Sequence, residues 1–210
     1  MCKTDLCTWV GFWFEGSAAI LGHMIDKNAL PTKVLWVDLE MTGLDPQQDV
    51  IIEVAAEVTD FDFKTLARYE AVVKQPRQIV ADRMEKNTWW ADYPENRNAF
   101  MRIMDSDEGK SSEQVQQELI ALVDDQFGGE AAVLGGNSIH SDRGFIKHWW
   151  PQLDSKLHYR MLDVSSLKIV MQGKYGIVFE KNNTHRALDD IQASIAELQF
   201  YLEWLHSSKM

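Results

Sequence analysis

Hydrophobic residues downstream of residue 30 first gather in short runs of strand length. Three runs are rich in β-branched or alternating apolar residues, and they cover residues 34–40, 50–58 and 66–73. The first run ends in Asp38 and Glu40 and leads into a turn-like stretch at 42–46, and residues 60–62 form a second turn-like stretch. We therefore predict three consecutive antiparallel strands.

Further along, the spacing of apolar positions changes to that of a helix. Ser111 is predicted to open this helix, with Gln114 as its capping-box partner, and the glycine pair 128–129 is predicted to end it. The apolar positions of the helix are Val115, Leu119, Leu122, Val123 and Phe127. Their spacing predicts one buried face.

The last third of the chain alternates predicted strands and helices. Residues 132–134 predict a short buried strand, and a helix is predicted to begin near Ser141 or Asp142 and to stop before Pro151. The final helix carries an apolar stripe in steps of four and three, formed by Ile191, Ile195, Leu198, Leu202 and Leu205. We interpret the stripe as core, and the order of elements predicts an α/β fold with a mixed central sheet flanked by helices.

Composition narrows the class of protein. A chain of 210 residues that is 45% hydrophobic and 25% charged is expected to form one soluble domain. The net charge of −11 argues against a protein that holds long nucleic acid through phosphate contacts, so any nucleic-acid substrate should be short. Only two cysteines occur, Cys2 and Cys7, which predicts a reducing compartment and no cysteine-based zinc site. No apolar run reaches the roughly 18 residues of a membrane span.

Residues 1–30 differ in character from the rest of the chain. Trp9, Trp13 and Phe14 lie there among small residues, and the run at 22–24 resembles a cloning junction. We interpret residues 1–30 as an engineered or poorly ordered extension, with a functional segment as the alternative. The folded domain is predicted to cover residues 31–210.

Carboxylates at the end of the first strand carry the first chemical signal. Asp38 and Glu40 are two positions apart, so the strand period sends both side chains to the same side of the sheet. Two adjacent anions repel unless one is protonated or a cation lies between them, and hard oxygen ligands suit Mg²⁺ or Mn²⁺. A solvated strand end is the alternative.

Two further acids lie at predicted helix starts. Asp190 begins the final helix, five positions after His185, so the two are expected to converge from the first turns and from the preceding loop. Asp142 follows the glycine-containing strand end at 135–136, a place where amide groups suit a phosphate-bearing ligand. Helix capping explains Asp142 and Asp190 equally well when each is taken alone.

Taken together, four segments resemble the signature blocks of the oligoribonucleases, a family of DEDDh 3′→5′ exonucleases. They match in order and spacing, and they are 36–44 (WVDLEMTGL), 136–142 (GNSIHSD), 158–165 (HYRMLDVS) and 184–190 (THRALDD). The resemblance runs from about residue 34 to about residue 205 and implies a ribonuclease H-like exonuclease domain. It also implies two divalent ions, Mg²⁺ or Mn²⁺, associated with Asp38, Glu40, Asp142 and Asp190, with His185 as the general base.

The same resemblance assigns substrate contacts. Leu44 matches a leucine that wedges against the bases, although a leucine in a loop is otherwise interpreted as a small core plug. Ser138, Arg160 and Ser165 match positions that close around the 5′ phosphate and so limit the length of RNA accepted. A surface salt bridge is the alternative role of Arg160.

An aromatic stacking residue and a dimer contact are also implied. Tyr159, together with His158, resembles residues that reach the site of a neighbouring protomer, which implies a homodimer. The stretch at 84–104 departs from the family pattern, and among its aromatics Trp89 is our choice as the base-stacking residue, with Trp90 and Tyr93 as alternatives. The segment at 174–183 is also loosely matched.

We therefore predict a cytoplasmic enzyme that degrades RNA of two to about five nucleotides to 5′-mononucleotides. An exonuclease that accepts longer RNA or DNA is the nearest alternative. A catalytically silent nucleic-acid-binding module on the same fold is the alternative from another class.

Overall fold

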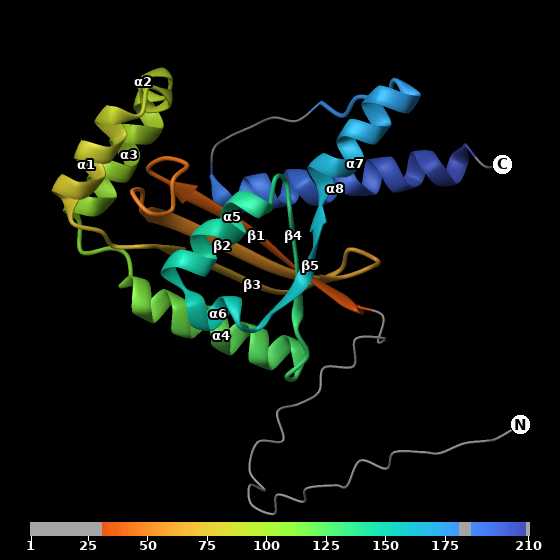
Figure 1. Cartoon of the computed structure of the whole chain (residues 1–210), viewed down its shortest axis with the longest axis horizontal. Helices are drawn as coiled ribbons and strands as arrows, with labels where there is room; N and C mark the ends of the chain where they lie inside the picture. The colour runs from red at the N-terminus through yellow and green to blue at the C-terminus, as the bar shows by residue number, and fades with distance from the viewer. Residues whose placement is uncertain (1–30, 181–185, 209–210) are drawn as a thin grey trace, which may run out of the picture.

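The computed structural model of the chain describes residues 31–180 and 186–208, which form one sheet covered by helices on both faces (Figure 1). The sheet has five strands in the order β3-β2-β1-β4-β5. The strands are β1 (Lys33–Met41), β2 (Ile51–Asp60), β3 (Thr65–Val72), β4 (Ala132–Gly136) and β5 (Leu157–Asp163). The strand β1 is central, with partners on both sides.

Strand directions divide the sheet into two halves. The strands β1, β2 and β3 pair antiparallel to one another, whereas β4 pairs parallel to both β1 and β5. The three consecutive antiparallel strands and the mixed sheet predicted from the sequence are confirmed. β5 was not predicted as a strand, because only Leu157 in it is buried and four of its seven residues are polar or charged.

One face of the sheet is covered by α4 (Ser112–Phe127), α5 (His140–Trp149) and α6 (Pro151–Asp154). The predicted cap of α4 is confirmed on its first half: Ser111 Oγ accepts a hydrogen bond from the Gln114 amide at 3.2 Å. Gly128 ends the helix with φ 60°, a left-handed conformation that glycine adopts without a steric penalty. Residues Leu35, Val37 and Leu39 of β1 face this layer.

The opposite face is covered by α7 (Val164–Val170) and α8 (Ala187–Ser207), and η1 (Met171–Tyr175) extends α7 by a π-helical turn. Ile191, Ile195 and Leu198 are buried against the sheet as predicted. The prediction that the whole stripe is core is wrong at its end, since Leu202 is 44% exposed and Leu205 is only half-buried. Figure 1 shows that the end of α8 runs past the sheet, where no strand lies beneath it.

Three helices that were not predicted cover one end of the sheet: α1 (Arg77–Lys86), α2 (Trp89–Asp92) and α3 (Pro94–Asp105). Val80, Met84, Trp90 and Phe100 pack with the start of β2 as a separate hydrophobic cluster. These helices form a side wall next to the end of β1 (Figure 1). The extension predicted at residues 1–30 lies outside the described residues. Among the described residues, no helix is long and apolar enough to cross a membrane.

Candidate active site

The alternation of β1 directs its two acids toward α8. Val34 and Trp36 pack with Ala187 and Ile191 of α8, and the residues in phase with them are Asp38 and Glu40. Asp190 points from the first turn of α8 to the same place. Carboxylate oxygens of Asp38, Glu40 and Asp190 all lie within 4.8 Å of one another. The predicted convergence of these three acids is thus present in the structure.

An ion pair to β2 anchors the start of α8. The Arg186 guanidinium lies 2.7 Å and 3.2 Å from the two carboxylate oxygens of Glu53, and the Ala187 amide donates to the same carboxylate at 3.3 Å. Glu53 pairs in register with Glu40 across β1 and β2. This contact therefore fixes the first turn of α8, and with it Asp190, against the strand that carries the other acids.

Asp142 lies beside the three acids but its carboxylate is held by the backbone. The register of β1 with β4 stops at Trp36 and Gly135, so the Leu39 amide extends beyond the last strand pair. Asp142 Oδ1 accepts a hydrogen bond from that amide at 3.0 Å. The helix α5 begins at His140 rather than at Ser141 or Asp142, so Asp142 is a first-turn residue and the capping alternative is wrong.

Burial and like charge raise the pKa values of these carboxyls. Burial raises the pKa of Glu40 to about 8, and the charges of Asp38, Glu53 and Asp190 push it the same way. Burial, with the charge of Asp38, also raises the pKa of Asp142 well above its usual value. Arg186 offsets only part of this effect at Glu40.

The donor set suits divalent cations. All the converging ligands are carboxylate oxygens, the type that Mg²⁺ and Mn²⁺ prefer, and their mutual repulsion is of the kind that a bound cation relieves. Neither histidine nor cysteine joins the cluster among the described residues. The acids of this site therefore fit a hard metal ion.

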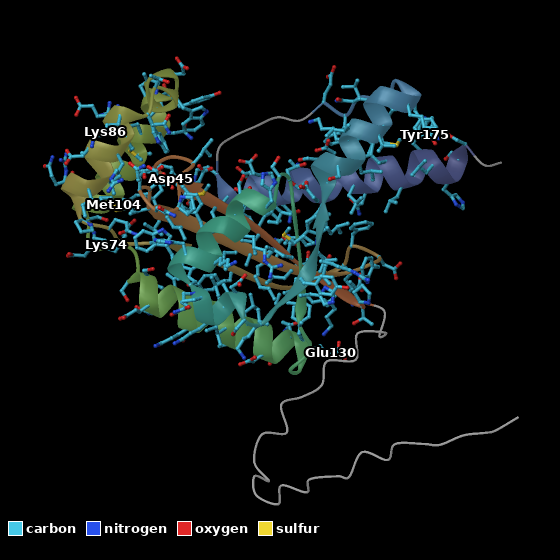
Figure 2. All side chains as sticks on the ribbon, in the orientation of Figure 1. Asp45, Lys74, Lys86, Met104, Glu130 and Tyr175 are labelled. Carbon is cyan, nitrogen blue, oxygen red and sulfur yellow. The ribbon has the colours of Figure 1, made fainter. Side chains whose placement is uncertain are left out.

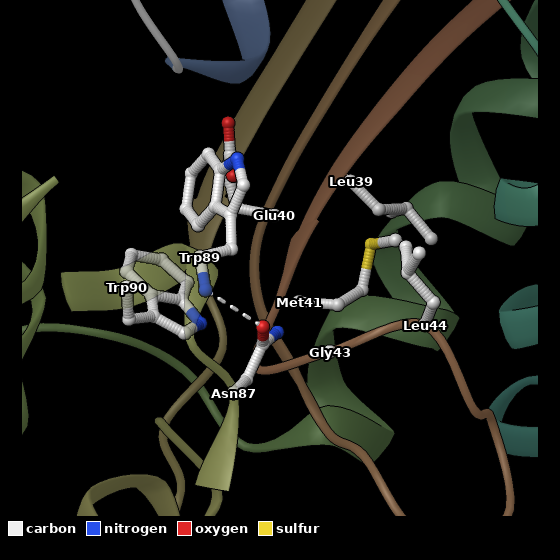
Figure 3. Close-up of a pocket in the computed structure, with 8 residues that line it drawn as sticks. All are labelled: Leu39, Glu40, Met41, Gly43, Leu44, Asn87, Trp89 and Trp90. Carbon is white, nitrogen blue, oxygen red and sulfur yellow. Dashed lines mark hydrogen bonds between the residues drawn. The ribbon is translucent and has the colours of Figure 1, made fainter. Parts of the chain in front are cut away.

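A cleft of about 240 Å³ opens next to Glu40, between the loop after β1 and the helical side wall. In Figure 3 the Trp89 ring and the Glu40 carboxyl lie at one side of the cleft and Leu44 at the other. Leu44 is 82% exposed, so its interpretation as a core plug is wrong. An exposed leucine facing an aromatic ring across a cleft has the geometry needed to hold a flat base.

The two adjacent tryptophans have different surroundings. Trp90 is 1% exposed, packs edge-on to Phe100 and donates its indole N–H to the Thr42 carbonyl at 2.9 Å. Trp89 is only half-buried, lines the cleft and stacks against Tyr93 with ring centroids 4.3 Å apart. Trp90 therefore supports the loop of Leu44 from behind, and Trp89 is the tryptophan that a ligand in the cleft could contact.

A mixed-charge hollow continues from this cleft on the other side of the Leu44 loop. It is lined by Asp45 and Asp49 from the loop and by Arg83 and Lys86 from α1. Figure 2 shows Asp45 and Lys86 on these two facing elements. The acids of the loop offset the two cations, so this hollow is no basic groove for a long nucleic acid.

Two of the predicted phosphate contacts lie together. Ser138 has a left-handed φ of 50°, rare for a residue with a side chain, and its amide donates to Asp163 Oδ1 at 3.0 Å and Ser165 Oγ at 2.9 Å. The hydroxyl oxygens of Ser138 and Ser165 are 3.2 Å apart. These bonds hold both serines at the ends of β4 and β5.

The other predicted contacts on β5 are not joined to this pair by a described bond. Arg160 lies over the ring of Tyr159, with 5.1 Å between its guanidinium carbon and the ring centroid, and His158 contacts the same ring. Tyr159 is 64% exposed. Tyr159 and Arg160 are exposed on the surface of β5, and His158 beside them is half-buried. His185 lies outside the described residues.

Sequence reasoning missed the residues that hold the site from behind. Glu53 and Glu197 are buried acids that were not singled out, and Asn137 was quoted in a motif without a role. A glutamate inside the apolar run of β2 was the available signal for Glu53, since an unpaired charge there is costly. Nothing in the local pattern marks the partners of Asn137.

Comparisons with known proteins agree with this geometry. The RNase T family, described as "Exonuclease", matches residues 35–198. An oligoribonuclease of Francisella tularensis is 40% identical over 83% of this chain and 96% of its own length, and one of Pseudomonas aeruginosa is 40% identical over 81% and 94%.

Solved structures of exonuclease I share the fold. The enzyme of Methylocaldum szegediense has a TM-score of 0.54 at 16% identity, and the Escherichia coli enzyme in complex with a dT13 oligonucleotide has one of 0.55 at 15% identity. The chain covers 39% and 41% of those longer proteins, with 79% and 81% of its own length matched. The predicted ribonuclease H-like exonuclease fold is confirmed, and the chain belongs to the oligoribonuclease family of exonucleases.

Proposed function

We propose that the protein is a 3′→5′ exoribonuclease that hydrolyses RNA of two to about five nucleotides to nucleoside 5′-monophosphates. The observation that carries this proposal is the convergence of Asp38, Glu40 and Asp190 within 4.8 Å beside a cleft that holds Leu44 and Trp89. A metal-binding cluster and a base-sized cleft with a common wall are the two parts that removal of a terminal nucleotide requires.

The acid cluster is the proposed holder of two Mg²⁺ or Mn²⁺ ions, with Asp142 as the fourth associated carboxylate. When bound, such ions activate a water and stabilise the departing 3′ oxygen in phosphodiester hydrolysis. The chain itself supplies a fixed arrangement of ligands, because Glu53 anchors α8 and the Leu39 amide holds Asp142.

His185 is proposed as the general base. An imidazole with a pKa near 6.5 is neutral at working pH and can accept a proton from the attacking water. The family resemblance carries this role. Its sequence neighbour Arg186 is tied to Glu53 at the start of α8.

Substrate is held at two places in the proposed complex. The 3′ base lies between Leu44 and Trp89, and the 5′ phosphate is bound by Ser138, Ser165 and Arg160. An anionic protein can bind RNA in this way, because only one or a few phosphates need local donors. The net charge of −11 favours this short-substrate function over an exonuclease for long RNA or DNA.

A homodimer in the cytoplasm is the remaining part of the proposal. An apolar groove lined by Phe61, Met161, Val170 and Leu202 lies on the side of the molecule that also bears β5, and a second copy covering it would bury these exposed side chains. Sedimentation of wild type and of Leu202→Glu tests this: the wild type is expected as a dimer, and the variant as a monomer. The cytoplasmic assignment rests on the low cysteine count.

Turnover of a dinucleotide and of a twenty-nucleotide RNA, each with Mg²⁺ and with EDTA, tests the function. The dinucleotide is expected to be hydrolysed far faster, and EDTA to stop the reaction. Equal or faster hydrolysis of the long strand would favour the broader exonuclease, and binding without hydrolysis in Mg²⁺ or Mn²⁺ would favour the silent binding module.

A further inference from the structure

A buried glutamate on α8 takes no part in the acid cluster. Glu197 is fully buried and lies seven residues, about two helical turns, after Asp190, so both side chains leave the same face of the helix. Its carboxylate accepts hydrogen bonds from the Tyr201 hydroxyl at 2.8 Å and from Asn137 Nδ2 at 3.2 Å, and Lys168 Nζ lies 3.6 Å away. A buried charge requires such partners, so its direction is fixed.

The carboxylate determines which way the Asn137 amide points. A carboxylate only accepts hydrogen bonds, so the nitrogen of Asn137 must face Glu197, and that nitrogen also donates to Ser194 Oγ at 2.9 Å. The amide oxygen therefore faces the opposite way, where Ser165 Oγ donates to it at 3.1 Å. The buried charge of Glu197 thereby makes Asn137 the acceptor in its bond with Ser165.

The same direction continues to the surface. Because Ser165 gives its hydroxyl proton to Asn137, its oxygen is left to accept, and it accepts from the Ser138 amide at 2.9 Å. In the 3.2 Å contact between the two hydroxyls, Ser138 must then be the donor. The exposed Ser138 hydroxyl can therefore donate its hydrogen bond to a ligand instead of to Ser165.

We infer that Glu197 and Asn137 are positioning residues that polarise this chain of bonds so that Ser138 presents a donor to the terminal 5′ phosphate of the substrate. A phosphate oxygen is an acceptor and selects a site with donors already oriented, because no reorientation then opposes binding. The inference rests on the proposed phosphate contact of Ser138 and deepens it, since it names what orders that contact.

The test uses isosteric substitutions that exchange donor and acceptor in the hydrogen bond between residues 137 and 197. Asn137→Asp replaces the donor that faces Glu197 by an acceptor, so the bond to Glu197 is lost and the two carboxylates repel each other, which moves the oxygen that accepts from Ser165 out of place. In the double variant with Glu197→Gln, the amide of the new glutamine can donate to the new aspartate, whose other oxygen still accepts from Ser165. The readout is the ratio of kcat/KM for pApA to that for ApA, measured with the full chain in Mg²⁺.

We expect a wild-type ratio well above one, a drop of about tenfold in Asn137→Asp that falls on the KM of pApA, and recovery in the double variant. Ser166→Ala, an exposed serine next to Ser165 but outside the chain of bonds, is the matched control and should keep the wild-type ratio.

Different results separate the inference from the function on which it rests. A wild-type ratio near one would overturn the phosphate contact itself. A high wild-type ratio that Asn137→Asp leaves intact would overturn the positioning role. If Asn137→Asp does not fold, the double variant decides: a folded double variant that lacks the wild-type ratio contradicts the inference, and one that has it supports the inference.

Discussion

Two regions at the same end of the sheet are built in opposite ways. Around Asp38, Glu40 and Asp190, carboxylates face one another and raise the pKa of Glu40 to about 8. Around Asn137, each described donor meets an acceptor, from Glu197 outward to Ser138. The first region opposes folding until a cation or proton arrives, whereas the second stabilises the fold by itself. Substitutions should therefore have opposite effects on stability in the two regions.

The largest expected effect is on turnover in the acid cluster. Asp190→Asn keeps the shape of the side chain but removes a charge that the cations need, so kcat should fall roughly 10²–10³-fold. The melting temperature without metal should stay the same or rise, because repulsion at Glu40 is relieved. Asp189→Asn, an exposed neighbour on α8, is the control for charge alone. Undiminished turnover in Asp190→Asn would show that the metal site lies elsewhere.

The adjacent tryptophans should separate function from folding. Trp90→Ala removes a fully buried ring and its bond to the Thr42 carbonyl, which should lower the free energy of unfolding by about 3–5 kcal/mol. Trp89→Ala should weaken dinucleotide binding by about 1–3 kcal/mol through lost stacking and cost less stability. Urea unfolding and KM measurements on both variants check this, and a reversal of the two effects would contradict the assignment.

The pKa of Glu40 predicts a pH effect on stability without metal. The folded state holds this proton up to about pH 8, whereas the unfolded state releases it near pH 4.5. The contribution of Glu40 to the free energy of unfolding is therefore fully present below pH 4.5 and is lost as the pH rises toward 8. Between pH 5 and pH 8 the loss should be on the order of 4 kcal/mol, since each pH unit is worth about 1.4 kcal/mol. Melting in EDTA from pH 5 to 9 measures it. Glu40→Gln should reduce the slope and leave the part that Asp142 contributes, and a slope that Glu40→Gln leaves unchanged would assign the effect to another group.

The smallest effect is expected in the hydrogen-bonded region. Tyr201→Phe takes one donor from the buried carboxylate of Glu197, which should lower the free energy of unfolding by about 1–2 kcal/mol at pH 7. Tyr201→Phe is thus expected to lower stability, whereas Asp190→Asn is expected to leave it unchanged or to raise it. A stabilised Tyr201→Phe would end the proposed difference between the two regions.

The sequence predicted the parts of the fold that follow a period. Strand alternation gave the common direction of Asp38 and Glu40, and the cap of α4 followed from Ser111 and the glycine at 128. Helices α1 to α3 were missed because their polar sequences bury few residues each; α1 buries only Val80 and Met84. Pro94 at the start of α3 was a usable helix signal that the prediction did not exploit.

Contacts between distant segments were beyond such reasoning. The bond from Asp142 to the Leu39 amide depends on where β4 stops, and the bond from Asn137 to Glu197 joins residues 60 positions apart. The exposure of Leu202 follows from the end of the sheet rather than from the helix period. Periodicity describes one element at a time, and these features arise where two elements meet.

The central position of β1 has a consequence for the order in which the molecule opens. Amides in a strand paired on both sides exchange with solvent only when most of the domain unfolds, whereas peripheral helices open at lower cost. Asp38 and Glu40 stay paired with β2 beyond the last pair of β1 with β4, and they follow directly on the part of the chain expected to open last. We expect the wall made by α1 to α3 to open before β1 does, because its side chains pack as a separate cluster at one end of the sheet.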